Sequence, residues 1–323
     1  MRPWLLWCPK MPKFSWVFLA LCLLACAGNA PHRTRQTPSP QKTQNEKNIS
    51  REKRSGRQLD AARRLLDAGR VGEARVKLQA IVDDKTAPPR NRARAQWLIL
   101  QAGGVRDFRL YWQLLERFPA TVAAEDALRE AIRLSREPDT VWVRRLLAFY
   151  RQHPDALSAE LALMEAARLA DRAGTPAWRD YAVHLLTFLA RHHPDSPHRD
   201  AALYRAAEIR REQGRWSDAI RLLQQLLQTE ETSMFFGDYN SEWLDDAQLL
   251  LGELYFSQGK KKDAIKAWSD LPRRFPHSRL RDRAWVRLMH LHEEMGNPLE
   301  ACLIARTLLG RMPQSRFVPH AEV

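Results

Sequence analysis

The sequence is poor in glycine and has no long alternating runs of Val, Ile and Thr, and both shortages restrict its fold. Glycine accounts for 13 of 323 residues, whereas Ala, Leu, Arg and Glu are frequent. Strands are not expected without alternating β-branched runs, and this composition favours helices. Hydrophobic residues make up 45% of the chain, enough for a sizeable core. The sequence therefore predicts an all-α protein.

Acidic residues are also too few to balance the charge, and the excess of positive charge is uneven. The net charge is +14, of which residues 1–26 carry +3, residues 27–57 carry +6 and the remaining 266 residues carry +5. A nucleic-acid-binding domain concentrates basic residues on its folded surface. Most of the excess here precedes the part of the chain that is expected to fold, so a nucleic-acid partner is not predicted.

The longest apolar run lies close to the N-terminus. Residues 14–25 carry no charge and follow Lys10 and Lys13. A basic stretch before a short apolar run is typical of a secretory signal, and the run is shorter than the roughly 20 residues that span a bilayer. The sequence leaves open whether translation starts at Met1 or Met11.

Leu23-Leu24-Ala25-Cys26 ends this run and resembles the lipobox of bacterial lipoproteins. The resemblance implies that residues 1–25 are removed, that Cys26 is lipidated and that the protein is anchored to a membrane. Ala27 follows the cysteine where enteric lipoproteins retained in the inner membrane have Asp, so the expected location is the periplasmic side of the outer membrane, with retention in the inner membrane as the alternative. The alternatives are an ordinary signal peptide with a chance cysteine and an uncleaved anchor.

Residues 26–57 lack large apolar side chains apart from Ile49. Such a stretch buries too little surface to offset its ordering entropy. The sequence predicts a disordered basic linker, which acts either as a spacer or as a contact for anionic lipid or cell-wall polymers.

Two spacings recur after residue 57. Glycine precedes alanine by five residues at Gly69–Ala74, Gly214–Ala219, Gly259–Ala264 and Gly296–Ala301. Proline precedes alanine by eight residues at Pro119–Ala127, Pro154–Ala162, Pro194–Ala202, Pro276–Ala284 and Pro313–Ala321. Recurrence at fixed spacing is typical of repeat architectures.

The repeated segments resemble the tetratricopeptide repeat, a unit of two antiparallel helices. The pattern is clearest from Gln248, Leu251, Gly252 and Tyr255 to Ala264, Trp268 and Pro276. The resemblance implies a helical-hairpin solenoid, a right-handed superhelix of about six or seven helix pairs. Residues 58–197 are predicted to form divergent repeats and residues 198–323 regular ones. Cys302 takes the place of Ile220 and Ile265 in other repeats, so we expect it in the core.

An insertion interrupts the regular repeats at residues 232–243. It carries four aromatic residues, Phe235, Phe236, Tyr239 and Trp243. Insertions in repeat proteins map to loops, often on a binding face. The alternatives are that these rings bind a partner or that they fill the gap between adjacent repeats.

The resemblance also implies a ligand groove lined by the first helix of each pair. Transferred position by position, the lining residues are Asp246, Leu249, Glu253 and Phe256 in one repeat and Arg283, Val286, His290 and Glu293 in the next. No catalytic residue, metal site or cofactor is predicted: His184, His192, His193 and His198 lie near one another, but without a cysteine or paired carboxylates at ligand spacing. The protein is not expected to be an enzyme.

Two bacterial families share parts of this organisation. The lipobox and the segment RQLDAARRLLDAGRVGEARVKL resemble BamD, the lipoprotein subunit of the outer-membrane protein assembly machine. The segment DAQLLLGELYFSQGKKKDAIKAW resembles the repeat domain of the periplasmic division coordinator CpoB, also called YbgF. The first resemblance implies an adaptor for envelope proteins or peptides, and the second a coordinator of cell-wall synthesis. A helical part of a murein-processing enzyme is a more distant alternative, because no catalytic domain follows the repeats.

Overall fold

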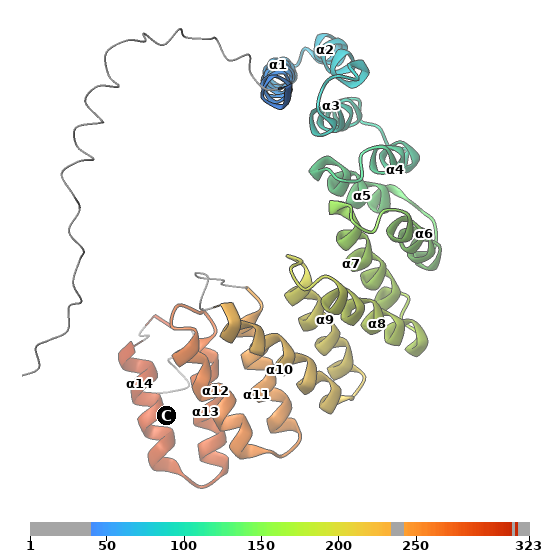
Figure 1. Ribbon diagram of the computed structural model, residues 1–323. Coiled ribbons are helices and arrows are strands. Elements are labelled where there is room, and N and C mark those ends of the chain that lie inside the picture. Colours follow the sequence, from blue (N-terminus) through green and yellow to red (C-terminus); the bar gives the residue numbers. More distant parts are fainter. Residues whose placement is uncertain (1–39, 234–241, 312–313, 316–323) are drawn as a thin grey trace, which may run out of the picture. The chain divides into compact units, whose positions relative to one another are not determined.

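The computed structural model describes residues 40–233, 242–311 and 314–315, and this part of the chain is all-helical (Figure 1). The helices are α1 (Pro40–Asp67), α2 (Val71–Asp83), α3 (Pro89–Ala102), α4 (Phe108–Arg117), α5 (Val122–Leu134), α6 (Asp139–Gln152), α7 (Leu157–Arg172), α8 (Pro176–His192), α9 (Arg199–Glu212), α10 (Trp216–Ser233), α11 (Leu244–Ser257), α12 (Lys261–Arg274), α13 (Arg281–Glu294) and α14 (Pro298–Arg311).

The chain divides into two units, residues 1–50 and residues 51–323. Of the first unit, the structure describes only the start of α1, residues 40–50. In the second unit, each helix from α2 to α14 packs against neighbours in the sequence, and α3, α5 and α7 also pack against one another in order. Within the described residues, α7–α8, α9–α10, α11–α12 and α13–α14 are helix–turn–helix pairs whose two helices pack closely. The prediction of an all-α helical-hairpin solenoid is confirmed.

Glycine and proline mark the two kinds of turn. Gly69, Gly214, Gly259 and Gly296 lie between the helices of a pair with φ of 72–73°, a left-handed conformation that glycine adopts without strain. Proline follows the second helix of several pairs, for example Pro276 after α12. Proline disfavours continuation of a helix because it lacks the N–H group and clashes with the preceding turn, although α12 accommodates Pro272 close to its end.

Helix α1 differs from the prediction for residues 26–57. The sequence predicts disorder throughout that stretch, whereas the structure places residues 40–57 in a helix that continues to Asp67. The packed end explains this difference: Ser55 is buried and accepts a hydrogen bond from Asn91 Nδ2 (2.7 Å), and Leu59 and Ala62 belong to a core shared with α2 and α3. Once a turn of helix is fixed, good helix formers such as Lys, Gln, Glu and Arg extend it at little cost. Residues 26–39 lie outside the described residues.

The contact between Gly252 and Trp268 fixes the crossing of α11 and α12. A Cβ atom on Gly252 would lie 2.3 Å from Trp268 Nε1. The indole N–H donates to Leu249 O (3.2 Å), and both Trp268 and Ala264 are buried. The close approach requires a small residue on α11, which confirms the predicted alignment of this repeat.

Serine side chains in the turns that follow three repeats bond back to the first helix of the same repeat. Ser196 Oγ donates to Glu160 Oε2 (2.6 Å), Ser278 Oγ to Asp245 Oδ2 (2.6 Å) and Ser315 Oγ to Asp282 Oδ2 (2.7 Å). In each pair, the serine follows the second helix of a repeat and the carboxylate lies near the start of that repeat's first helix. Hydrogen bonds to charged acceptors are stronger than neutral ones, so this contact holds the two ends of a repeat together.

The prediction for Cys302 is wrong. Its side chain is exposed on α14, beside Leu299 and Leu303, which are 72% and 50% exposed. Ile220 and Ile265 are covered by the repeat that follows, whereas α14 is the last described helix and no further described helix packs on that side.

Candidate functional site

A groove between α11 and α13 brings together several of the predicted binding residues. Its volume is about 480 Å³, and it is lined by Glu253, Phe256 and Ser257 of α11, Trp268 of α12, and Arg287, His290, Leu291, Glu293 and Glu294 of α13. We call this set the α11–α13 groove. It lies between the first helices of two adjacent pairs, where the repeat pattern predicts a ligand surface.

The floor of the groove is apolar. Trp268 is 1% exposed, and its ring lies 5.9 Å from that of Phe256, measured between centroids. Phe256 is 36% exposed, so one side of its ring packs on the tryptophan and the other side is accessible. Partly exposed aromatic side chains over a packed floor are typical anchor points of protein interfaces.

The rim of the groove carries both signs of charge in paired form. Glu253 Oε1 accepts hydrogen bonds from Arg283 Nη2 (3.1 Å) and Arg287 Nη2 (3.5 Å). His290 Nδ1 lies 3.3 Å from Glu293 Oε2. Lys261 Nζ lies 3.7 Å from Glu294 Oε2. Because the charges balance, the groove does not select a strongly charged ligand of either sign.

The structure separates the eight predicted groove residues into two groups. Glu253, Phe256, His290 and Glu293 line the groove, and Arg283 contacts it through Glu253. Leu249 and Val286, in contrast, are 4% and 8% exposed and lie in the core with Trp268 and Trp285, so they do not line the groove. Leu249 and Val286 lie on the side of α11 and α13 that is covered by the packed core.

Asp246 lies at the start of α11 and does not line the groove. Its pKa is raised by burial and further by the neighbouring carboxylates of Asp245 and Glu208. The sequence analysis missed Arg287 and Glu294. Arg287 lies three residues before His290 and therefore on the same side of the helix. This spacing could have identified Arg287 as a groove residue from the sequence.

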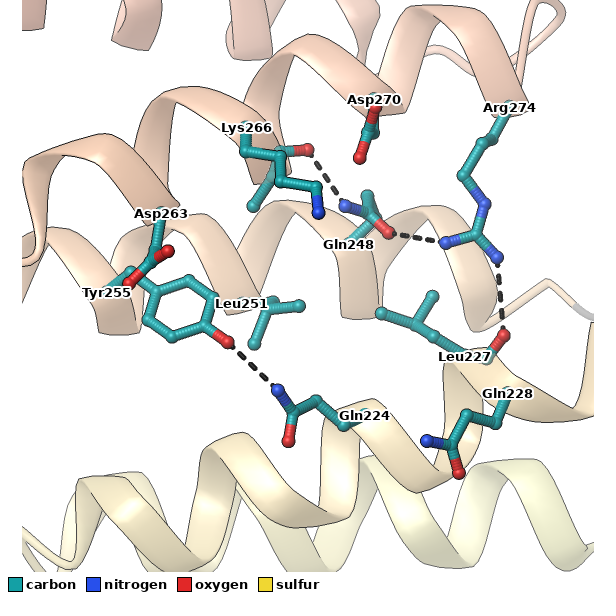
Figure 2. Close-up of a pocket in the computed structure, with 11 residues that line it drawn as sticks. Gln224, Leu227, Gln228, Gln248, Leu251, Tyr255, Asp263, Lys266, Asp270 and Arg274 are labelled. Carbon is teal, nitrogen blue, oxygen red and sulfur yellow. Dashed lines mark hydrogen bonds between the residues drawn. The ribbon is translucent and has the colours of Figure 1, made fainter.

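A second cavity, of about 370 Å³, lies among α10, α11 and α12 (Figure 2). Its polar side chains bond to one another: Gln224 Nε2 donates to the Tyr255 hydroxyl (3.0 Å), Gln248 Nε2 to Ala267 O (2.9 Å), and Arg274 to Gln248 Oε1 (3.1 Å) and Leu227 O (3.2 Å). These bonds join two repeats. The cavity is therefore better explained as part of the interface between two repeats than as a ligand site.

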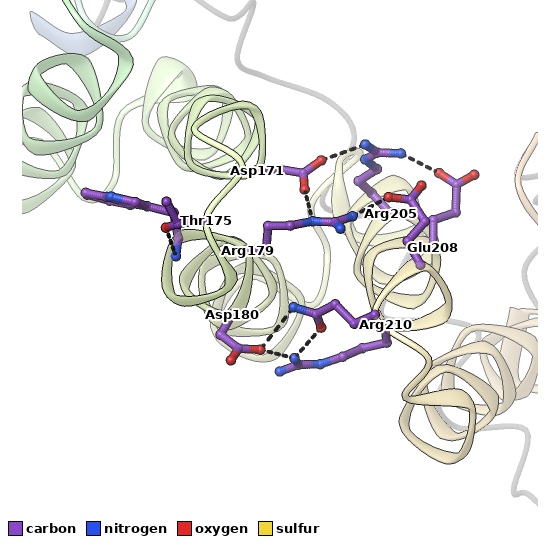
Figure 3. A network of polar contacts seen from close by, with 10 residues as sticks. Asp171, Thr175, Arg179, Asp180, Arg205, Glu208 and Arg210 are labelled. Carbon is purple, nitrogen blue, oxygen red and sulfur yellow. Dashed lines mark hydrogen bonds and ion pairs between the residues drawn. The ribbon is translucent and has the colours of Figure 1, made fainter.

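A network of charged side chains connects α7, α8 and α9 at another interface between repeats (Figure 3). Asp171 accepts from Arg179 Nε (3.1 Å) and from Arg205 Nη2 (2.7 Å), and Asp180 pairs with Arg210. The carboxylates come from α7 and α8, and Arg205 and Arg210 come from α9. This network orients α9 against the preceding pair.

The aromatic insertion is only partly described. Trp243 packs on Tyr204 of α9 with ring centroids 5.2 Å apart, and burial raises the pKa of Tyr204 to about 12. Trp243 thus fills the gap between repeats. Phe235, Phe236 and Tyr239 lie outside the described residues, as does Cys26.

Within residues 40–233 and 242–311, no three His, Cys, Asp or Glu side chains are grouped as a metal site requires. None of the described helices combines the length and apolar character needed to cross a bilayer.

Comparison with protein families identifies two repeats. Residues 201–233 and 246–278 match the tetratricopeptide repeat family, and these segments cover the α9–α10 and α11–α12 pairs. The α11–α13 groove therefore begins on an identified tetratricopeptide repeat, a type of unit that mediates protein–protein interaction. A search of curated proteins gives no match.

Several solved structures are similar to this chain. MamA from Desulfovibrio magneticus is 14% identical over 65% of this chain and 97% of its own, with a TM-score of 0.39. PilW, a type IV pilus biogenesis factor, is 13% identical over 83% of this chain and 98% of its own, with a TM-score of 0.38. PilF of Pseudomonas aeruginosa is 13% identical over 84% of this chain and 98% of its own, with a TM-score of 0.36.

Proposed function

We propose that this protein is a membrane-anchored periplasmic adaptor that binds an envelope protein, or a peptide segment of one, in the α11–α13 groove. The observation that carries the proposal is the convergence of Glu253, Phe256, His290 and Glu293. These four are among the eight residues that the resemblance to tetratricopeptide repeats implies, and they line one groove of about 480 Å³.

The chemistry of the groove fits a polypeptide ligand. Phe256 and Trp268 offer apolar contact to a side chain, while Glu253, Arg287 and Glu293 offer hydrogen-bond acceptors and donors at the rim. An apolar centre with a polar rim is the usual anatomy of a protein interface. No described group in the groove has the arrangement of a nucleophile with its base, so we propose binding rather than catalysis.

Lipidation of Cys26 would place the adaptor at the membrane. Replacing Cys26 with serine removes the thiol that accepts the lipid. We expect Cys26→Ser to lose lipid labelling and to move from the membrane fraction to the soluble periplasmic fraction. If the variant remains in the membrane uncleaved, residues 14–25 act as a plain anchor instead.

Site-specific crosslinking tests the groove. A photo-crosslinking amino acid placed at Phe256 should capture a partner, whereas the same amino acid at Trp216 of α10 should not. Trp216 is a matched control because it is aromatic and 38% exposed, close to the 36% of Phe256. Equal capture at both positions would contradict a specific groove.

The identity of the captured protein distinguishes the two envelope processes. Outer-membrane assembly subunits support our proposal of a BamD-like role, which rests on the lipobox and the early repeat. Cell-wall synthases or division proteins would instead support the role of a CpoB-like coordinator. Capture confined to cytosolic proteins would contradict both.

A further inference from the structure

An apolar pocket lies between α6 and α8, formed by helices other than those of the α11–α13 groove. Its volume is about 400 Å³, and it is lined by Val143, Arg144 and Leu147 of α6 and by Ala177, Trp178 and Tyr181 of α8. The rings of Trp178 and Tyr181 meet edge to face, with centroids 5.9 Å apart. Arg144 is the one charged residue in the lining.

The pocket leaves large aromatic surface partly uncovered. Trp142, on the same α6, is 1% exposed, which shows that this helix can bury a tryptophan completely. Trp178, Tyr181 and Leu147, in contrast, all keep part of their surface accessible. Covering that surface would be favourable in proportion to its area. Tryptophan, tyrosine and arginine are also the residue types that contribute most to interface energies.

The helices around the pocket carry an excess of positive charge. The acidic residues of α4, α6 and α8 are Glu116, Asp139 and Asp180. Asp139 is bound by Arg172 of α7, Asp180 by Arg210 of α9, and Glu116 accepts a hydrogen bond from Trp112 Nε1 (2.6 Å). All three carboxylates are thus engaged.

Five of the arginines on the same helices lack carboxylate partners among the described residues, whereas Arg145 of α6 pairs with Glu137 and Arg179 of α8 pairs with Asp171. Within the described part of the chain, no ion pair involves Arg109, Arg117, Arg144, Arg151 or Arg191. The neighbouring first helices differ, because their arginines pair along the helix, as Arg133 does with Glu130 and Arg168 with Glu165. Of these five arginines, Arg144 is the one that lines the pocket, so the pocket carries an unpaired positive charge.

We propose that the α6–α8 pocket is a second docking site, which takes a large apolar side chain from an acidic segment of a partner protein. The apolar side chain packs on Trp178 and Tyr181. A carboxylate flanking it pairs with Arg144. Complementary charge of this kind orients a partner and speeds its association.

The experiment uses a random peptide library as the probe and the full chain carrying Cys26→Ser as the bait. Peptides are selected on this bait and, separately, on a bait that also carries Ala177→Leu. The abundance of each peptide is then compared between the two selections. Ala177 is exposed at the pocket, so leucine fills the pocket without disturbing the core. Ala148→Leu is the matched control, because Ala148 is exposed on α6 but does not line the pocket.

We expect the peptides lost on the Ala177→Leu bait to carry Asp or Glu around one large apolar residue. Such a peptide should bind the Ala177→Leu variant about tenfold more weakly than the bait that carries Cys26→Ser alone, as expected when an anchor pocket is lost. Arg144→Glu should weaken binding by about tenfold as well, because it replaces attraction with repulsion. Ala148→Leu and Arg75→Glu, an exposed charge reversal on α2, should leave the affinity unchanged.

Three results would overturn the proposal. One is that no selected peptide is lost on Ala177→Leu, or that the peptides lost there are basic or uncharged. Another is that Arg75→Glu weakens binding as much as Arg144→Glu, since only net charge would then matter. The third is that phosphatidylglycerol vesicles bind the bait through Arg144 while no acidic peptide does, because the surface would then recognise a membrane. None of these results bears on the α11–α13 groove.

Discussion

At the scale of single residues, side-chain volume decides how the repeats pack. Gly252 and Trp268 form a complementary pair, in which the absent Cβ on α11 provides the space that the indole of α12 occupies. The indole then donates to Leu249 O. A change of one methyl group at this position affects both the packing and the hydrogen bond.

Gly252→Ala should therefore lower the free energy of unfolding by about 1–3 kcal/mol, the usual cost of overpacking a core. Thermal and chemical denaturation followed by circular dichroism measure the effect. Gly56→Ala is the control, because Gly56 also lies within a helix but a Cβ atom added there would meet no atom within 4 Å. That change should be neutral or stabilising, since alanine is the better helix former by about 1 kcal/mol. Equal effects at both sites would contradict the close contact.

The insertion provides a second residue-scale prediction. Trp243 packs on Tyr204, so Trp243→Ala should lower the melting temperature. We expect the triple change of Phe235, Phe236 and Tyr239 to alanine to leave melting nearly unchanged while reducing partner recovery. Gly237, Asp238 and Asn240 between these rings favour an exposed turn. A fall in melting temperature as large as that of Trp243→Ala would assign all four rings to the core.

At the scale of helices, ion pairs and turn serines set how one element meets the next. Asp139 at the start of α6 accepts a hydrogen bond from Arg172 Nε at the end of α7 (2.6 Å). This hydrogen bond lowers the pKa of Asp139, partly offset by burial. A carboxyl whose pKa is lower in the folded state stabilises the fold above its unfolded pKa of about 3.9 and loses that effect as the pH falls through the folded value.

Asp139→Asn should consequently be less stable than the parent at pH 7, and the difference should shrink as the pH falls below about 4. Urea denaturation at a series of pH values measures it. In an Arg172→Gln background the same substitution should show a much weaker pH dependence, because the partner that lowers the pKa is absent. A difference that persists unchanged at low pH would show that Asp139 acts through packing.

A further prediction at this scale concerns the hydrogen bonds of the turn serines. Ser278→Ala removes the hydrogen bond to Asp245 and should cost about 1.5–3 kcal/mol, as for hydrogen bonds to charged groups. Combining it with Asp245→Asn should cost less than the sum of the two single changes, since both remove one contact. The repeat interrupted by the insertion lacks this contact in the described structure: Asp200, the equivalent of Asp245, is buried with Oδ2 unpaired.

At the scale of the whole molecule, the second unit is an array in which stability depends on neighbouring pairs. The core around Leu59, Leu78 and Ile81 is distinct from the main core, which extends from Ala93 to Ala267. In repeat proteins the stability is approximately a sum of the repeats' own stabilities and of their nearest-neighbour contacts, so loss of one end need not unfold the rest.

A chain beginning at Pro88 should therefore retain a cooperative melting transition and the crosslinks formed from Phe256. Circular dichroism and the crosslinking assay measure the two properties. Loss of the transition would mean that α1 and α2 stabilise the entire array. Retained folding with lost crosslinks would mean that the ligand also contacts the N-terminal helices.

The sequence by itself determined the local features of this protein. Composition and periodicity predicted helices, and glycine and proline spacing predicted the two kinds of turn. The resemblance to a repeat family implied eight groove residues, of which Glu253, Phe256, His290 and Glu293 line the groove. These features depend on interactions within a few residues along the chain, such as backbone conformation at Gly259 or the helix-breaking effect of Pro276. One sequence is enough to recognise them.

The tertiary structure decided which side of each helix is covered. Leu249 and Val286 share helices with groove residues but are buried, Cys302 occupies a core position of the repeat yet is exposed, and residues 40–57 extend a helix whose end is packed. The α6–α8 pocket joins residues more than thirty positions apart. Such features depend on how neighbouring helices cross and on whether a following repeat exists to cover them, and local sequence periodicity carries neither kind of information.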